Sequence, residues 1–369
     1  AQTRALSSFY GAKWKCNEPN RKLKAQNLMM ASYMSVWPWI NNVSTEDLMC
    51  AVARVKNKAK LDNYNVSVHV VQLWAKACPQ HLIGVIAHLF TNPANVAEIE
   101  IAAKAFGKEA VDTEVDNTRI ILPLPSLLAV AESLVHLRMT PYINQMFPVL
   151  DTCYLGGGKH TSTTEIQHTT RLIIEHGIDN QGRSSVAQCD VKQYYDRIPL
   201  VRVAHFFVRS GMPIELVSMF LVLQLMPRIR IFVNDTLEDV FIANRTIGAL
   251  TGTRLAGLAG IIPIADCFAT LQPLFRPLGW QLKKQFDQNI TDVYGSEWRD
   301  HVGNLLTKFK HMALCLEQVP TTISCLSWID KLFVCAHDPK TAVYMAEQIE
   351  AHLMSKWALN IKDGSRKIL

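Results

Sequence analysis

The chain has 369 residues, of which 49% are hydrophobic and 19% are charged, and its formal net charge is +6. This composition excludes an intrinsically disordered chain and allows two or three subdomains around a sizeable core. The most apolar run, 213–227, contains Glu215 and is bounded by prolines, so we expect no membrane-spanning segment.

The cysteines and the N-terminus indicate an intracellular protein. Nine cysteines are spread from Cys16 to Cys335 without a C-x-x-C pair, and no apolar signal segment opens the chain. An odd number of scattered cysteines is typical of reduced, buried thiols, so we expect a nuclear or cytoplasmic location. Because the chain lacks an initiator Met and ends abruptly at Leu369, we expect it to be a piece of a longer polyprotein.

Positive charge is concentrated at the start of the chain. Residues 1–60 contain ten lysines and arginines against three acidic residues, a net charge of +7, so the other 309 residues carry −1. Tryptophans interleave with the basic residues, which suits a phosphate-backbone partner, although a solvated helical face fits the pattern equally well. The candidate nucleic-acid-binding residues are Lys13, Lys15, Arg21, Lys22, Lys24, Arg54, Lys56, Lys58 and Lys60.

The first half of the chain is predicted to be largely helical. Residues 1–110 indicate helices, a short strand follows around Arg119, and a Leu/Val stripe predicts a helix over 127–139. A capping box formed by Ser162 and Glu165 predicts the start of the next helix, which Gly177 should end.

The second half alternates strands and helices. The expected order is a strand at 185–191, helices, a β-hairpin over 228–244 and an apolar helix over 255–271, followed by a polar helical insertion at about 281–310. A second hairpin over 321–336, a helix over 338–357 and a closing strand at 359–362 complete it. Without its insertions this order predicts an α+β fold with a split βαββαβ antiparallel sheet and helices on one face.

Two aspartates are expected to meet in this sheet. Asp190 ends the first predicted strand, and Asp330 lies at the turn of the central hairpin. The two strands are neighbours in the predicted topology, so both carboxylates should converge. Paired carboxylates on rigid elements are the ligands that a two-metal phosphoryl-transfer site requires.

Four segments resemble the motifs of reverse transcriptases of the LINE and group II intron type, in a divergent branch such as those of protist retroelements. The first, from Asp190 through Tyr195 and Asp196 to Ile198, resembles the palm motif D-I-K-x-x-F-D-x-I. The others are 248–257, which resembles G-x-x-Q-G-x-x-L-S-P, 328–332, which resembles Y-A-D-D-hydrophobic, and 357–367, which resembles G-L-x-I-N-x-x-K. Upstream, Arg119-Ile-Ile-Leu resembles the fingers motif R-P-I-x-L.

The motifs also depart from the family pattern. Thr251 replaces a glutamine, and Lys331 replaces the second aspartate of the third motif. The fingers motif lacks its proline. These departures favour an alternative interpretation, in which a catalytically decayed palm persists as a nucleic-acid-binding scaffold. A third interpretation, an RNA-directed RNA polymerase, shares the palm but fits the first motif poorly.

The resemblance covers about 115–369 and implies a right-hand polymerase. It implies fingers over 115–184 and a palm over 185–369, with 1–114 a basic N-terminal extension or fingers base and the thumb absent. The implied function is an RNA-directed DNA polymerase of a retrotransposon. Its implied partners are an RNA template, a DNA or RNA primer and deoxynucleoside triphosphates, with no membrane.

The resemblance also implies roles for single residues. Asp190, Asp330 and the Val191 carbonyl would hold two Mg²⁺ ions, or Mn²⁺, and Tyr195 would act as a gate against the ribose 2′-hydroxyl. The implied nucleotide-binding residues are Arg119, Arg138, Tyr195, Thr251, Gly252 and Lys367. Simpler interpretations stand beside these roles: the aspartates cap turns, Tyr195 packs in the core, Arg138 lies on a solvated helix, and Asp196 caps the next helix.

Overall fold

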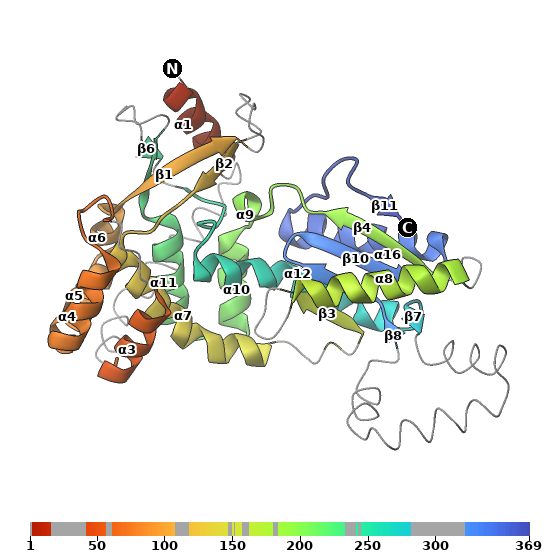
Figure 1. Ribbon diagram of the computed structural model, residues 1–369, viewed down its shortest axis with the longest axis horizontal. Helices are drawn as coiled ribbons and strands as arrows, with labels where there is room; N and C mark the ends of the chain where they lie inside the picture. Colours follow the sequence, from red (N-terminus) through yellow and green to blue (C-terminus); the bar gives the residue numbers. More distant parts are fainter. Residues whose placement is uncertain are drawn as a thin grey trace. The chain divides into compact units, whose positions relative to one another are not determined.

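The computed structural model describes residues 2–15, 42–56, 61–107, 118–146, 150, 152–156, 162–179, 184–232, 241–242, 245–281 and 322–369. Nearly all of the predicted insertion at 281–310 lies outside these ranges. The chain divides into two compact units, the first formed by 1–146 and 193–262 and the second by 147–192 and 263–369. Both contain helices and small sheets, as an α+β fold requires (Figure 1). The borders of the fingers and palm at 114 and 184 stay a prediction. The two compact units are defined by internal contacts, which need not coincide with functional subdomains.

The first unit is mostly helical, as predicted. Its most apolar helix is α11 (Ile214–Leu225), in which every residue from Leu216 to Leu225 is buried. A helix that is apolar all round belongs in the centre of a core. The other helices are α1 (Gln2–Lys13), α3 (Thr45–Arg54), α4 (Val68–Ala77), α5 (Pro79–Thr91), α6 (Pro93–Ala97), α7 (Ser126–Met146), α9 (Tyr194–Arg197) and α10 (Leu200–Arg209).

A four-stranded sheet in the order β2-β1-β5-β6 completes the first unit. Strand β2 (Thr118–Ile121) is the predicted strand around Arg119, and β5 (Arg228–Phe232) pairs with β6 (Phe241–Ile242) as the predicted hairpin. Strand β1 (Glu100–Gly107) lies inside the region that was predicted to be helical. Its three alanines favour a helix locally, but pairing with β2 and β5 on both sides outweighs that preference.

The second unit is built on a five-stranded sheet in the order β11-β4-β10-β9-β3. The sheet contains β11 (Lys367–Ile368), β4 (Ser185–Asp190), β10 (Lys331–Ala336) and β9 (Cys325–Trp328). Each of these four strands is antiparallel to the next in this order, which is the split arrangement that was predicted. The predicted closing strand at 359–362 is wrong, because β11 closes the sheet and Ile361 forms only a single bridge to Val191. Strand β3 (Cys153–Gly156) adds a parallel fifth strand beside β9, and β7 (Trp280–Gln281) pairs separately with β8 (Thr322–Ile323).

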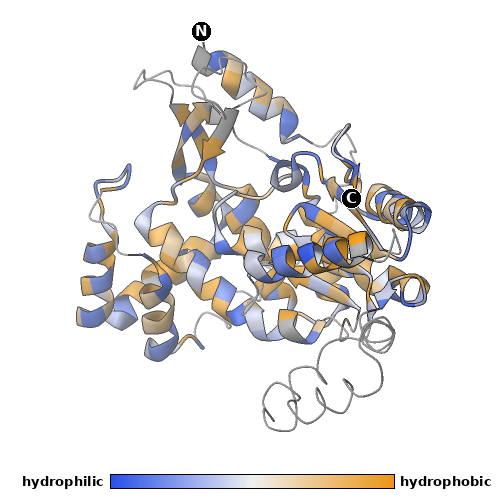
Figure 2. Cartoon of the chain, turned by 45° about the vertical axis from the view of Figure 1, so that its right-hand side comes forward, coloured by the Kyte–Doolittle hydropathy of each residue, from blue (hydrophilic) through white to orange (hydrophobic). Residues whose placement is uncertain are grey.

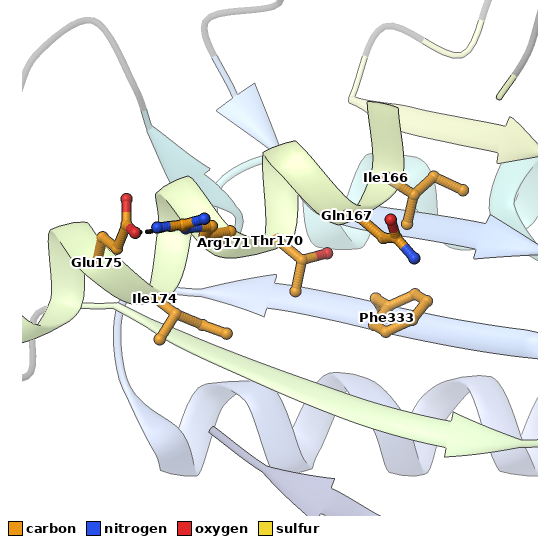
Figure 3. A pocket seen from close by; sticks show the side chains of 7 residues that line it. All are labelled: Ile166, Gln167, Thr170, Arg171, Ile174, Glu175 and Phe333. Carbon is orange, nitrogen blue, oxygen red and sulfur yellow. Dashed lines mark hydrogen bonds and ion pairs between the residues drawn. The ribbon is translucent and has the colours of Figure 1, made fainter. Parts of the chain in front are cut away.

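Helices cover both faces of this sheet, so the prediction of helices on one face is wrong. Helix α8 (Thr163–Asp179) passes in front of the strands in Figure 1 and α16 (Pro339–His352) lies behind them. The reason is that β10 has apolar residues on both faces, with Phe333 towards α8 and Leu332 buried on the other side. Figure 2 shows mostly hydrophobic residues along the strands. A pocket of about 420 Å³ with apolar walls remains between α8 and Phe333 (Figure 3).

Helix α8 begins as predicted but ends later. The capping box is present, with the Glu165 amide donating to the Ser162 hydroxyl at 3.2 Å and the Ser162 amide to the Glu165 carboxylate at 3.2 Å. Gly177 does not end the helix, which runs to Asp179. A side chain at 177 would bring its Cβ to 2.4 Å from the Ser184 hydroxyl. Gly177 therefore permits a close approach of the chain rather than a helix stop.

Helix α12 (Arg254–Phe275) is longer than predicted and passes through Pro263. By length and composition it is apolar enough to cross a membrane, which corrects the expectation that no such run exists. Of its most apolar window, 67% is buried inside the protein, and the core helix of a soluble protein meets the same criteria. The sequence analysis took 213–227 as the most apolar run and ended the predicted helix at residue 271, whereas α12 continues to Phe275.

We predict opposite effects for two glycine substitutions. In Gly156→Ala the new Cβ would lie 2.4 Å from the Ser327 carbonyl oxygen and 2.5 Å from the Trp328 ring, so the free energy of unfolding should fall by about 1–3 kcal/mol. In Gly84→Ala, on the exposed side of α5, nothing lies within 4 Å of the new Cβ, so stability should rise by about 0.5–1 kcal/mol. Urea unfolding of both variants measures the two changes, and equal midpoints would contradict the β3–β9 packing.

Candidate functional site

Asp190 and Asp330 lie side by side at one end of the sheet of the second unit. Asp190 is the last residue of β4, and Asp330 lies in the two-residue turn between β9 and β10. The Val191 amide donates a 2.9 Å hydrogen bond to the Asp330 carbonyl, so the backbones of the two predicted metal-binding segments are in contact. The predicted adjacency of the two strands is confirmed.

The turn that carries Asp330 is strained. Ile329 has a φ of +56°, in the left-handed region that branched side chains rarely adopt. Such a conformation costs about 1–3 kcal/mol and persists only where the surrounding structure imposes it. Here the pairing of Trp328 with Lys331 closes the hairpin around it. Strained residues of this kind concentrate at functional sites.

Lys331 stands directly opposite Asp190 in the antiparallel register. Because the Val191 amide bonds to the Asp330 carbonyl, Asp190 and Lys331 form a non-hydrogen-bonded pair, with Cα atoms about 4.5 Å apart. Side chains of such a pair extend from the same face of the sheet. A cation therefore occupies the position from which a second carboxylate would face Asp190.

The main chain of Asp190 is anchored by the segment that follows the π-helical turn Leu353–Trp357. Its amide donates to the Ser365 hydroxyl at 3.1 Å, and its carbonyl accepts from the Lys362 amide at 2.8 Å. Its carboxylate oxygen Oδ1 is buried and has no hydrogen-bond partner among the described residues. Buried polar atoms usually have partners, so an unpartnered carboxylate oxygen fits a ligand for a hard cation.

The ligand set is small. Among the residues that the structure describes, no group of three or more His, Cys, Asp or Glu side chains is placed to hold a metal ion. The contact that is present joins the backbone of Val191, next to Asp190, to the backbone of Asp330.

In the first unit, the part of the first motif from Gln193 onwards meets the second motif. The Tyr195 carbonyl accepts a 2.8 Å hydrogen bond from the Ala249 amide, and the Tyr194 hydroxyl donates to the Gly260 carbonyl. The Tyr195 ring lies against Gly260, where an added Cβ would be 3.2 Å from Cε1. Gly252 has a φ of +94°, so the turn at Thr251 and Gly252 requires glycine. Both turn residues are exposed.

A buried carboxyl holds the start of the helix after this turn. Glu132 of α7 is 3% exposed and accepts a 2.6 Å hydrogen bond from the Leu255 amide, in the first turn of α12. Burial raises the pKa of Glu132 to about 7, against hydrogen bonds from Leu255 and Arg254 that lower it. The sequence analysis missed this residue, although a lone carboxylate inside an apolar helical stripe was the available signal.

Two predicted ligand-binding cations instead have internal partners. Lys13, predicted to bind nucleic acid, forms a 2.6 Å ion pair with Asp196, and its side chain is only 8% exposed. Trp14 Nε1 also donates to Asp196 at 3.1 Å, so Asp196 holds α1 rather than capping a helix. This buried ion pair neutralises the charge of Lys13, and its role in nucleic-acid binding stays a prediction. Arg138 forms a 2.6 Å ion pair with Asp47, which links α7 to α3.

The remaining predicted cations are not brought together by any described contact. Lys15, Arg54 and Lys56 are exposed. Lys367 is also exposed and lies in β11 opposite Gln188. Arg119 lies in β2, where its backbone is paired with Phe106 of β1. The side chain of Arg119 is outside the described part of the structure. Also outside them are Arg21, Lys22, Lys24, Lys58 and Lys60.

No protein-family model matches the chain, and no curated protein matches it either. The functional argument therefore depends on the motifs and on the geometry within each unit. In the second unit the structure brings together Asp190, Val191 and Asp330. In the first unit it brings the Tyr195 segment against the segment that contains Thr251 and Gly252.

We predict that Glu132→Gln stabilises the protein at alkaline pH. A carboxyl whose pKa rises on folding, here from 4.5 to about 7, contributes stability below pH 4.5 that is lost as the pH rises through 7. Glutamine keeps an acceptor for the Leu255 amide without the ionisation penalty. At pH 8 the variant should be more stable than the parent by up to about 3 kcal/mol, since one pKa unit corresponds to about 1.4 kcal/mol.

Thermal unfolding of parent and variant between pH 5 and pH 8.5 measures this difference. Glu46→Gln, at an exposed position of α3, makes the same substitution away from the buried site and is the matched control. A constant gap between parent and Glu132→Gln across the range would show that Glu132 does not titrate in it.

Proposed function

We propose that the chain is an RNA-directed DNA polymerase domain of the reverse-transcriptase type, which adds deoxynucleotides to a primer 3′-hydroxyl on an RNA template. The observation that carries this proposal is the pair Asp190 and Asp330, placed on hydrogen-bonded backbone segments at one end of a split antiparallel sheet. The resemblance of the segments around both residues to reverse-transcriptase motifs supports the proposal. The strand order of the second unit also resembles that of a polymerase palm, and we propose fingers over 115–184.

The proposed cofactor is a pair of Mg²⁺ ions, or Mn²⁺, held by the two carboxylates and the Val191 carbonyl. Bound there, the ions would lower the pKa of a primer 3′-hydroxyl and neutralise the departing pyrophosphate. Asp190 Oδ1, which has no hydrogen-bond partner in the part of the chain that the structure describes, supports this assignment. The chain's own contribution is rigidity, because β4, β10 and the hydrogen bonds of Ser365 and Lys362 fix the Asp190 backbone.

Lys331 limits this site. Its ammonium supplies no ligand and repels a divalent cation, and it stands opposite Asp190. We therefore propose weak metal binding with a preference for Mn²⁺. The same observation favours a second candidate function, a nucleic-acid-binding scaffold derived from a polymerase palm in which catalysis has been lost.

We predict that Lys331→Asp tightens Mn²⁺ binding at least about tenfold, a difference of about 1.4 kcal/mol, because an acidic ligand replaces a repelling charge. Asp190→Asn should abolish the site. Electron paramagnetic resonance of free Mn²⁺ measures affinity, and primer extension on an RNA template measures activity. Exposed Lys340→Asp on α16 carries the same charge change and should alter neither.

The outcomes separate the two candidate functions. Extension that rises in Lys331→Asp and vanishes in Asp190→Asn supports the polymerase. Template binding without extension in every variant, even where Lys331→Asp binds Mn²⁺, would replace the polymerase with the scaffold.

We predict that Tyr195→Ala raises ribonucleotide incorporation relative to deoxynucleotide by at least about tenfold, since about 1.4 kcal/mol of steric discrimination would be lost. Tyr195→Phe keeps the ring against Gly260 and should retain the parental ratio. Paired primer-extension rates with the two nucleotide types measure it. An unchanged ratio in an active Tyr195→Ala enzyme would assign Tyr195 to core packing.

A further inference from the structure

Two free thiols face each other across the edge of the sheet in the second unit. Cys153 of β3 and Cys325 of β9 are register partners in the parallel ladder, and the Cys325 thiol donates a hydrogen bond to the Cys153 sulfur. Neighbouring strands lie about 4.8 Å apart, which falls within the Cα separations that a disulfide spans. The Cα separation expected for this pair therefore lies within the range that a disulfide spans.

Two hydroxyl groups lie against the Cys153 sulfur. It is 3.3 Å from the Ser324 hydroxyl and 3.7 Å from the Thr152 hydroxyl. The Ser324 hydroxyl has further acceptors in the carbonyl and hydroxyl of Thr152, at 3.0 and 2.8 Å. Led by the bond from Cys325, these contacts lower the pKa of the Cys153 thiol to about 7 although burial opposes them.

The pKa values of the neighbouring thiols are shifted in the opposite direction. Burial raises the pKa of the thiols of Cys189, Cys267, Cys325 and Cys335. Cys153 is also less enclosed, because it is half-buried whereas these four are buried. One member of the facing pair thus has the character of a nucleophile and the other that of a protonated thiol.

We propose that Cys153 and Cys325 form a peroxide-reactive thiol pair, in which Cys153 is the attacking thiol and Cys325 the resolving thiol. The oxidant class is a hydroperoxide. This inference is independent of the proposed polymerase function, since neither cysteine lies among the residues that would bind metal or nucleotide.

The reaction balances in two steps. The Cys153 thiolate attacks one peroxide oxygen, the O–O bond breaks, and a sulfenic acid forms while the leaving oxygen takes up the proton released by the thiol. The Cys325 sulfur then attacks the Cys153 sulfur, the S–O bond breaks, and hydroxide leaves as water with the Cys325 proton. Two thiols lose two electrons, and one hydrogen peroxide becomes two waters.

The experiment exposes the reduced full chain to hydrogen peroxide at pH 7 and follows each cysteine by alkylation and peptide mass spectrometry. A thiol with a pKa of about 7 is half ionised, about 15-fold more than an ordinary thiol, and its lower intrinsic nucleophilicity offsets about fivefold. We therefore expect Cys153 to be oxidised about threefold faster than an ordinary thiol, and before Cys50 and Cys78, although both are more exposed. The product should be a peptide that links Cys153 to Cys325.

Two variants test the assigned roles. Cys325→Ser should stop at a Cys153 sulfenic acid that dimedone traps, and Ser324→Ala should slow the oxidation of Cys153. Circular dichroism establishes that each variant is folded. The proposal is overturned if the parent chain gives no 153–325 linkage, or if Cys50 or Cys78 is oxidised first, and neither result depends on a variant.

Discussion

The antiparallel pairing of β4 with β10 is the constraint on which the candidate site depends. The register runs from Ser185 opposite Ala336 to Asp190 opposite Lys331. A slip by one residue would exchange the two faces of a strand, and both faces here are packed against helices. Burial on both sides therefore fixes which side chain confronts Asp190. The strained Ile329 is tolerated for the same reason, because the paired strands leave the turn no alternative path.

The order of elements in the second unit could be predicted because hydrophobic alternation and turn residues are local signals. The strands that were misassigned depended on partners far along the chain. β1 is alanine-rich and becomes a strand only because β2 and β5 flank it. β11 consists of an exposed lysine and isoleucine without alternation, and it is defined by its bonds to β4. The presence of helices on both faces of the sheet likewise depended on where α8 packs. The hydrophobic periodicity of α8 does not specify which face of the sheet it covers.

The candidate site shows the same division. Asp190 and Asp330 could be recognised from the sequence because Asp190 ends a predicted strand and Asp330 lies between two. Each also lies in a segment that resembles a reverse-transcriptase motif. The ion pair of Lys13 could not be foreseen, because a count of charges reveals no partner and Asp196 is remote from Lys13 in sequence. Glu132 and the Cys153–Cys325 pair escaped notice because their character arises from burial and cross-strand contacts. Local residue patterns therefore located the acidic pair, whereas electrostatic environment required three-dimensional contacts.

The outer edge of β4 has a further consequence. Its main chain is paired by β11 at Ala187 and Gln188, by the Ser365 hydroxyl and the Lys362 amide at Asp190, and by a bridge to Ile361 at Val191. An open strand edge is a template for intermolecular strand addition, and proteins commonly shield it. Short, irregular pairing shields this edge along most of β4 and offers no straight strand for another chain to extend. The segment that anchors Asp190 thus also protects the sheet against edge-to-edge aggregation.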